Sequence, residues 1–347
     1  MQDKKYIQKD VVREVIGRKC KNAPVPTMLS HYWGIGLPEK YGAELMHLDE
    51  EFPDDVYMGY YLEPGTDIST LPNNPEYRWG FRDYTGVERH GIGQNAVLLS
   101  DWSELDEFLE KMPRADEPYI FDHLREPIAA AKEQGRYCSG FWWRLFHERL
   151  WQIRGMENLM YDYYDHPDLL RKLCGALLEY YKGLIDRYAE MGCDGIFTSD
   201  DLGHQRGPMM SPEIFEEIYY PVYKQFADYV HAKGMQFILH SCGNNTDLLP
   251  YLIRAGVDVF HPVQKGCMDY RETAERFGKE ITFLVGIDVQ HLLPEAAPDE
   301  IRKEVERLYK IFYKNEGGLM FAVGNGVMPD TPLENIHTML EVIRSYR

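Results

Sequence analysis

The feature that most constrains this chain is a regular alternation of helix-like and strand-like segments from Leu169 to the C-terminus. Leu169–Met191 has leucines at helical spacing and is followed by Gly192, a common residue after a helix end. Gly195–Ser199 is a short apolar run typical of a buried strand. Five strand–helix units follow one another in this way, and such a succession requires a parallel sheet.

The other segments of this half carry clear boundary signals. Ser211 followed by Pro212 predicts a helix start, and that helix should stop at Gly234. Thr331–Glu334 reads as a capping box with proline at the first helical position of the last helix. Another helix is expected over Thr246–Ala255, and the remaining strands are expected at Met235–Leu239, Val257–Val263, Ile281–Ile287 and Leu319–Val323.

The first half of the chain is less regular. Strands are expected at Val25–Leu29 and Tyr137–Trp142, with a weaker eighth strand near Asp55–Tyr60. Residues of about 50–122 are rich in Pro, Gly, Asp and Tyr, with hairpin-like runs over Trp79–Gly93. We expect this segment to be an insertion into a single domain of residues 1–347. Its aromatic content predicts that it packs over the ligand-binding mouth or at a contact between copies in a homo-oligomer.

Polar residues at the strand ends decide between two α/β architectures. A barrel gathers the carboxyl ends of all strands into one ring, whereas an open doubly wound sheet spreads them along a line. A Gly-x-Gly-x-x-Gly loop and a Walker-type lysine loop are absent from the sequence. We therefore predict a (β/α)₈ TIM barrel. The polar residues expected to converge at its mouth are Asp200, Asp201, His240, Cys242, Gln264, Asp288 and Asn325.

Charge and composition restrict the partners and the compartment. The formal net charge of −18 opposes binding to nucleic acid and to anionic membranes. No apolar stretch of about eighteen residues is present, and the charged N-terminus lacks the apolar region of a secretory signal. A cytoplasmic location is the expectation. The six cysteines are then reduced, so a special cysteine is a ligand or a nucleophile rather than half of a disulfide.

The strongest chemical signal is His240-Ser-Cys242 at the end of a predicted strand. Alternate residues of a strand point to the same side, so the imidazole and the thiol face one direction. Together they supply half of a typical zinc site, although a buried pair without metal is the alternative. Asp200 and Asp201 either bind metal and transfer protons or cap helices. Cys267 is either a further sulfur ligand or an ordinary loop cysteine.

Other candidates lie near the same mouth. We assign Asp201, His240, Gln264 and Asp288 to catalysis, with a loop-holding role as the alternative for Asp288. The candidates for substrate binding follow the first strand, the double aspartate and the last strand, and they are His31, Trp33, His204, Arg206 and Asn325.

Several motifs resemble the uroporphyrinogen decarboxylase superfamily and, within it, its corrinoid-dependent methyltransferase branch. The resemblance covers roughly Arg154–Tyr346, while the N-terminal third is similar only through Ala23–Thr27. The motifs are RGMENLMYDYYDHPDLL, GCDGIFTSDDLGHQRGPMMSPEIFEEIYYPVYK, ILHSCGN, AGVDVFHPVQ, LVGIDVQHLLP and MPDTPLENI.

The resemblance implies a zinc-dependent enzyme that passes a methyl group between a small substrate and the cobalt of a corrinoid carried by a partner protein. It implies that His240 and Cys242 hold the zinc with a further cysteine after the last strand. Here Asn325 occupies the place of that cysteine, and Gln264 stands where related enzymes can offer a carboxylate. A complete site must therefore recruit Asp200, Asp201, Cys267 or a water. Such a harder site suits polarisation of a methyl-donor oxygen better than activation of a thiol.

The leading hypothesis is therefore transfer of a methyl group from a small, methoxy-aromatic-like donor to the corrinoid. A methylcobalamin:thiol methyltransferase of the coenzyme M type is an alternative, and a non-catalytic ligand-binding barrel is another. Uroporphyrinogen decarboxylation ranks last. The stretch Thr27–Trp33 lacks the arginine with which those decarboxylases hold substrate carboxylates, and so acidic a chain disfavours a polyanionic substrate.

Overall fold

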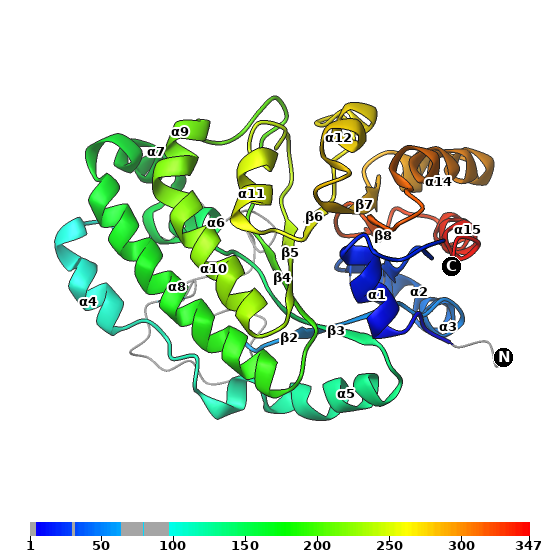
Figure 1. Ribbon diagram of the computed structural model, residues 1–347, viewed down its shortest axis with the longest axis horizontal. Helices are drawn as coiled ribbons and strands as arrows, with labels where there is room; N and C mark the ends of the chain where they lie inside the picture. The colour runs from blue at the N-terminus through cyan, green and yellow to red at the C-terminus, as the bar shows by residue number, and fades with distance from the viewer. Residues whose placement is uncertain (1–4, 30–31, 64–78, 80–96) are drawn as a thin grey trace.

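The computed structural model describes residues 5–29, 32–63, 79 and 97–347. Eight parallel strands form one sheet in the order β1-β8-β7-β6-β5-β4-β3-β2, and they build a nearly closed barrel with helices around it (Figure 1). The TIM-barrel prediction is confirmed, including the weak strand. The strands are β1 (Thr27–Met28), β2 (Val56–Tyr60), β3 (Tyr137–Trp142), β4 (Gly195–Ser199), β5 (Gln236–His240), β6 (Val259–His261), β7 (Thr282–Ile287) and β8 (Leu319–Val323).

Two carboxylates close the seam between β1 and β2. The backbone N–H of Asp55 donates to the carbonyl of Thr27 at 3.1 Å, and the Asp55 carboxylate accepts the N–H of Thr27 at 3.0 Å. One residue earlier, Asp54 accepts the N–H of Leu29 at 2.7 Å. Side-chain oxygens therefore satisfy the buried N–H groups of Thr27 and of Leu29, which follows β1, where the regular ladder is short.

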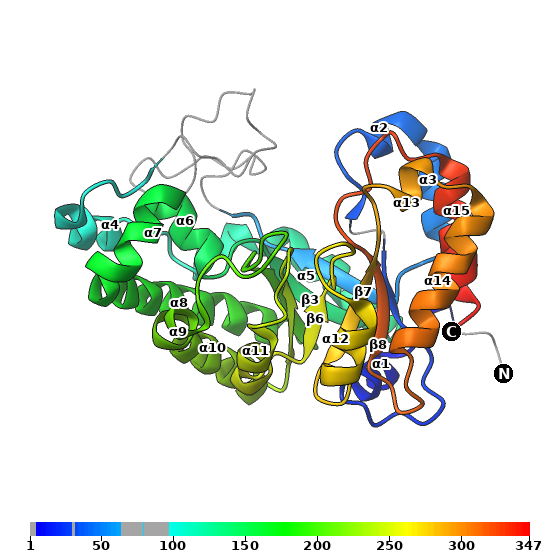
Figure 2. The ribbon, with the colours of Figure 1, turned by 90° about the horizontal axis from the view of Figure 1, so that it is seen from above.

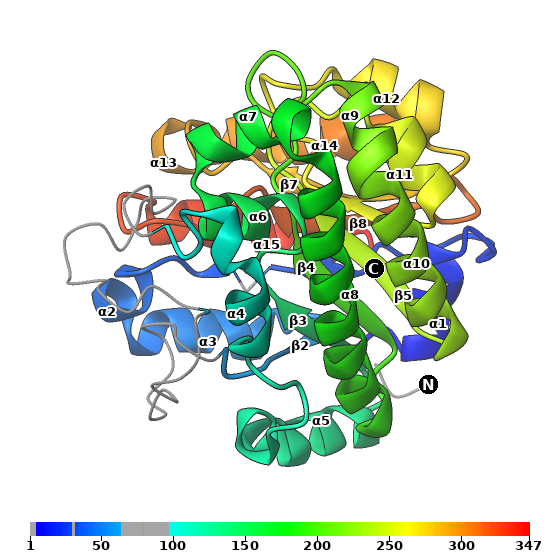
Figure 3. The ribbon, with the colours of Figure 1, turned by 90° about the vertical axis from the view of Figure 1, so that its left-hand side faces the viewer.

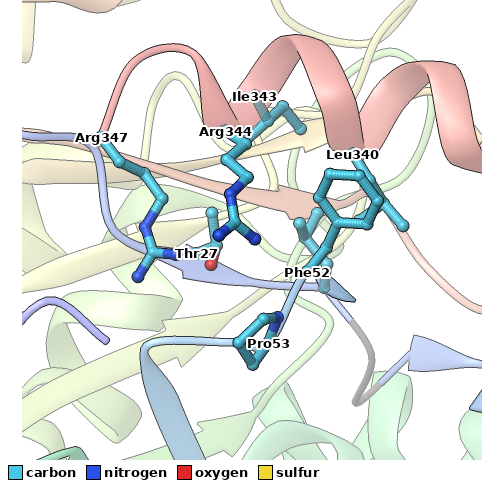
Figure 4. A pocket seen from close by; sticks show the side chains of 8 residues that line it. Thr27, Phe52, Pro53, Leu340, Ile343, Arg344 and Arg347 are labelled. Carbon is cyan, nitrogen blue, oxygen red and sulfur yellow. The ribbon is translucent and has the colours of Figure 1, made fainter. Parts of the chain in front are cut away.

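A small pocket lies beside this seam, under the last helix (Figure 4). Arg347 donates to the carboxylate of Asp55, and Arg344 donates to the carbonyl of Glu51. These bonds tie the end of the last helix to the segment before β2. None of the predicted site residues in the described part of the chain lines this pocket.

The helices cover the outside of the strands. Figures 1 and 3 show α8 and α10 side by side on one flank, and Figure 2 shows α14 and α15 together on another. Among the described residues, no helix combines the length and the apolar character needed to span a bilayer. The helices are α1 (Lys9–Ile16), α2 (Leu37–Tyr41), α3 (Ala43–Glu51), α4 (Leu105–Glu110), α5 (Asp122–Glu133), α6 (His147–Arg154), α7 (Met156–Asp165), α8 (Pro167–Glu190), α9 (Pro212–Ile214), α10 (Tyr220–Ala232), α11 (Leu249–Ala255), α12 (Tyr270–Phe277), α13 (Leu292–Glu295), α14 (Pro298–Phe312) and α15 (Leu333–Arg344).

The predicted helix starts have mixed outcomes. The Ser211 hydroxyl accepts the N–H of Ile214 at 3.3 Å, so this residue caps α9 as predicted. The prediction of a capping box at the start of the last helix is wrong. Its N-cap residue is Pro332, which has no side-chain acceptor, and the Thr331 hydroxyl is buried with no hydrogen-bond partner among the described residues. The backbone of Thr331 instead bonds back to Met328 in a turn, which moves the helix start one residue further along the chain.

The end of β6 also differs from the prediction. The strand stops at His261, two residues early, because Pro262 has no N–H to donate and Val263 has a left-handed φ of 55°. This early end leaves His261 at the rim of the barrel.

The predicted insertion is only partly described. β2 lies inside its range, and residues 97–121 pack against α6, α7 and α8, so that α4 lies beside α8 (Figures 1 and 3). The Trp102 indole donates to Asp162 at 2.8 Å, and Arg154 donates to the carbonyl of Leu99 at 2.6 Å. Apart from Trp79, the hairpin-like run Trp79–Gly93 lies outside the described residues. Packing of the insertion over the mouth stays a prediction.

Candidate metal centre

Strand register brings residues from three neighbouring strands to one level. In the ladder, Ser199 of β4 pairs with His240 of β5, and His240 pairs with His261 of β6. Asp201 lies two residues beyond Ser199, and Cys242 lies two residues beyond His240. Parallel strands of a barrel all end on the same face, so these side chains meet at the carboxyl-end mouth.

Asp201, His240 and Cys242 form a compact set of ligand atoms that all lie within 4.8 Å of one another. Nε2 of His240 is 3.3 Å from Sγ of Cys242 and 3.6 Å from Oδ1 of Asp201. Bond lengths of about 2.0–2.3 Å place neighbouring ligands of a tetrahedral zinc ion roughly 3.3–3.8 Å apart. The spacing and the N/S/O chemistry of this set therefore fit zinc.

The electrostatics of the cluster also favour a cation. Burial lowers the pKa of His240 to about 4, so its imidazole is neutral. Burial raises the pKa of Asp201 to about 6, and burial together with Asp201 raises that of Glu148 to about 7. The pKa of the Cys242 thiol is raised well above its ordinary value, first by burial and then by the charge of Asp201. A bound dication offsets these penalties by stabilising the anionic forms.

The cluster borders a partly open pocket at the ends of β5 to β8. Gln264 contributes to its wall and accepts the N–H of Gly243 at 2.6 Å. Asn325 lies across the pocket, and its side-chain N–H donates to Sγ of Cys242 at 3.7 Å. The lining residues are Cys242, Pro262, Gln264, Lys265, Gly286, Asp288, Val289, Gln290, Gly324 and Asn325.

Asp288 lines this pocket but mainly organises its own loop. Its carboxylate accepts the N–H groups of Gln290 at 2.9 Å and His291 at 3.3 Å, and it lies 3.5 Å from the ammonium of Lys265. These contacts match the loop-holding alternative.

Asp200 is oriented away from the ligand set. Its fully buried carboxylate accepts the N–H groups of Phe146, His147 and Glu148 and the hydroxyl of Tyr223, the last at 2.6 Å. It therefore caps the start of α6 from the neighbouring strand. Burial and the nearby Glu148 raise its pKa to about 7.

None of the remaining candidates that the structure describes belongs to the ligand set. Cys267 is half-buried in a turn closed by its own N–H and the carbonyl of Gln264. His204 and Arg206 are exposed on the loop after β4. Trp33 donates its indole N–H to Asp49 at 2.9 Å. His31 lies outside the described residues.

Sequence reasoning missed three residues around His240. Nδ1 of His261 is 2.7 Å from Nδ1 of His240, and the Trp143 ring meets the His240 ring edge-on with 5.8 Å between centroids. Glu148 accepts the Ser199 hydroxyl at 2.5 Å and reaches the cluster from α6. Of these three, only His261 could have been predicted from the sequence, because it is the last residue of β6 as His240 is the last residue of β5.

The sequence model of the uroporphyrinogen decarboxylase (URO-D) family matches residues 151–346. This match includes β4 to β8 and the whole ligand set. The chain belongs to the uroporphyrinogen decarboxylase family. His31 and Trp33 lie outside the matched region.

The named relatives of the chain share little sequence identity with it. A methylated-thiol–coenzyme M methyltransferase of Methanosarcina mazei is 22% identical over 55% of this chain and 49% of the relative. A methylcobamide:CoM methyltransferase of the same organism is 24% identical over 52% of this chain and 49% of the relative. A uroporphyrinogen decarboxylase of Carboxydothermus hydrogenoformans is 27% identical over 39% and 37%. The chain thus spans about half the length of the methyltransferases it matches.

The fold is shared with a solved methyltransferase from Methanosarcina mazei. The two structures superpose with a TM-score of 0.54 at 19% identity, over 64% of this chain and 63% of the other. At this sequence identity the similarity supports the barrel architecture alone, and the chemistry has to be inferred from the residues of the site.

Proposed function

We propose that this protein is a zinc-dependent methyltransferase of a corrinoid system. It would move a methyl group from a small methylated donor to the cobalt of a corrinoid carried by a partner protein. The observation that carries the proposal is the set of Asp201, His240 and Cys242 at the barrel mouth, with a spacing that suits zinc. The coenzyme M methyltransferases among the relatives support the same reaction class.

In this proposal His240, Cys242 and Asp201 hold the ion, which supplies Lewis acidity to the atom that leaves the methyl group. Asn325 directs its N–H at the sulfur of Cys242 and lowers the basicity of that ligand. Gln264 holds the backbone beyond Cys242 through its bond to Gly243. A carboxylate in place of a second sulfur makes the ligand set harder, which favours an oxygen leaving group and hence a methoxylated donor.

The second candidate is methyl transfer to a thiol, because both named methyltransferase relatives carry coenzyme M in their names. Two assays separate the candidates. Methylation of free cob(I)alamin by a methoxylated phenol supports the first, and demethylation of methylcobalamin that requires an added thiol supports the second.

Cys242→Ala tests the centre itself. We expect this variant to lose both zinc content and methyl transfer, because only two of the three ligands remain. Cys267→Ala is the matched control and should retain both, since this cysteine lies in a loop turn outside the ligand set. A protein that binds no zinc at millimolar supply, with full activity in Cys242→Ala, would refute the proposal and favour a non-catalytic or metal-independent barrel.

A further inference from the structure

We infer that His261 sets the tautomer of His240, so that His240 presents an unprotonated Nε2 to the metal. This assigns His261 as a positioning residue and rests on the proposed metal centre. The strand ladder itself pairs the two residues, so their rings meet wherever β5 and β6 are in register.

The chain of reasoning begins at β8. Nε2 of His261 is 3.0 Å from the carbonyl oxygen of Val323. A carbonyl oxygen only accepts, so this nitrogen must carry a proton. His261 is fully buried, and a second proton on its ring would place a charge in the interior. The neutral ring therefore has a lone pair on Nδ1.

That lone pair is directed at His240. The two Nδ1 atoms are 2.7 Å apart, whereas the Tyr32 hydroxyl lies 3.5 Å from the same nitrogen of His261. Two facing lone pairs at 2.7 Å would repel, so Nδ1 of His240 must donate.

The consequence appears at the other nitrogen of His240. With its proton on Nδ1, the neutral ring has a free lone pair on Nε2, the atom 3.3 Å from Sγ of Cys242 and 3.6 Å from Oδ1 of Asp201. The opposite tautomer would direct an N–H into the ligand set and block coordination. An outer partner of a metal-binding histidine acts in this way by fixing its tautomer and ring orientation.

The first test is ¹⁵N NMR of histidine-labelled, metal-free wild-type protein. The chemical shifts should show His240 with a protonated Nδ1 and an unprotonated Nε2. A protonated Nε2 in the wild type would overturn the inference. This readout needs no metal, so it separates the inference from the proposed function.

The second test measures zinc affinity by competition with a chelating dye. His261→Phe keeps a ring but removes the acceptor, so zinc affinity should fall by about 10- to 100-fold. His261→Asn keeps an acceptor near the position of Nδ1 and should recover most of that loss. His231→Phe removes a histidine that is 2.8 Å from Asp258, outside the ligand set, and should bind zinc like the wild type.

The outcomes are distinct. Wild-type affinity in His261→Phe, or equal losses in His261→Phe and His261→Asn, would overturn the inference. Failure of the wild type to bind zinc, with His240 protonated on Nδ1, would refute the proposed function and leave the tautomer assignment standing.

Discussion

Asp201→Asn should weaken zinc binding and at the same time stabilise the metal-free protein. The amide keeps an oxygen acceptor for the N–H of Cys242, which now bonds to Oδ1 of Asp201 at 2.7 Å. It removes an anionic ligand. Loss of a residue that only hydrogen-bonds to a ligand typically lowers metal affinity by about 10- to 100-fold, so loss of this ligand should lower zinc affinity further. It also removes a carboxylate whose negative charge destabilises the metal-free folded protein.

The size of this destabilisation follows from the pKa of Asp201. Burial raises it to about 6, roughly two pH units above the ordinary value of about 3.9. The unfolded chain thus releases this proton at lower pH than the folded protein does. Stability is therefore lost as the pH rises from about 4 to about 6, and the full difference is about 3 kcal/mol. The side chain is 26% exposed, so screening by water reduces the expected gain in the variant to about 1–2 kcal/mol.

The assay is urea denaturation of the metal-free wild type and variant at pH 4.5 and pH 7.5. The free energies of unfolding should be similar at the lower pH, and the variant should be more stable at the higher one. Asp299→Asn, an exposed aspartate in the first turn of α14, is the control and should change little at either pH. A variant that is less stable than the wild type at pH 7.5, or that binds zinc equally well, would refute the reasoning.

Two further changes probe the same mouth. Asn325→Cys should tighten zinc binding by at least about tenfold, because tetrahedral zinc holds two sulfurs about 3.8 Å apart and the Asn325 amide now lies 3.7 Å from Sγ of Cys242. Unchanged affinity in dye competition would show that this side chain does not reach the ion. Asp200→Ala should lower the free energy of unfolding by about 3–4 kcal/mol, because three buried donors and one half-buried donor lose their acceptor at about 1 kcal/mol each. A loss below about 1 kcal/mol in urea denaturation would contradict its role as the cap of α6.

Most of the fold could be predicted because its signals are local. Strands and helices can be recognised from the spacing of hydrophobic residues and from the glycines and prolines near their ends. Accordingly, β3, β4 and β8 have the predicted bounds. The failures have local causes as well. The turn from Thr331 back to Met328 competed with the predicted capping box, and the backbone of Val263 ended β6 early.

The residues of the candidate metal site could likewise be predicted only in part. That His240 and Cys242 share a direction follows from the period of two in any strand, so the sequence alone determined this half of the centre. Neighbouring residues point to opposite sides, and only the tertiary structure decided between Asp200 and Asp201. The loop after β3 supplies N–H groups that engage Asp200, which leaves Asp201 to face His240. His261 likewise became visible only in the β5–β6 register, because hydrogen bonds between strands, not spacing along the chain, place its ring against His240.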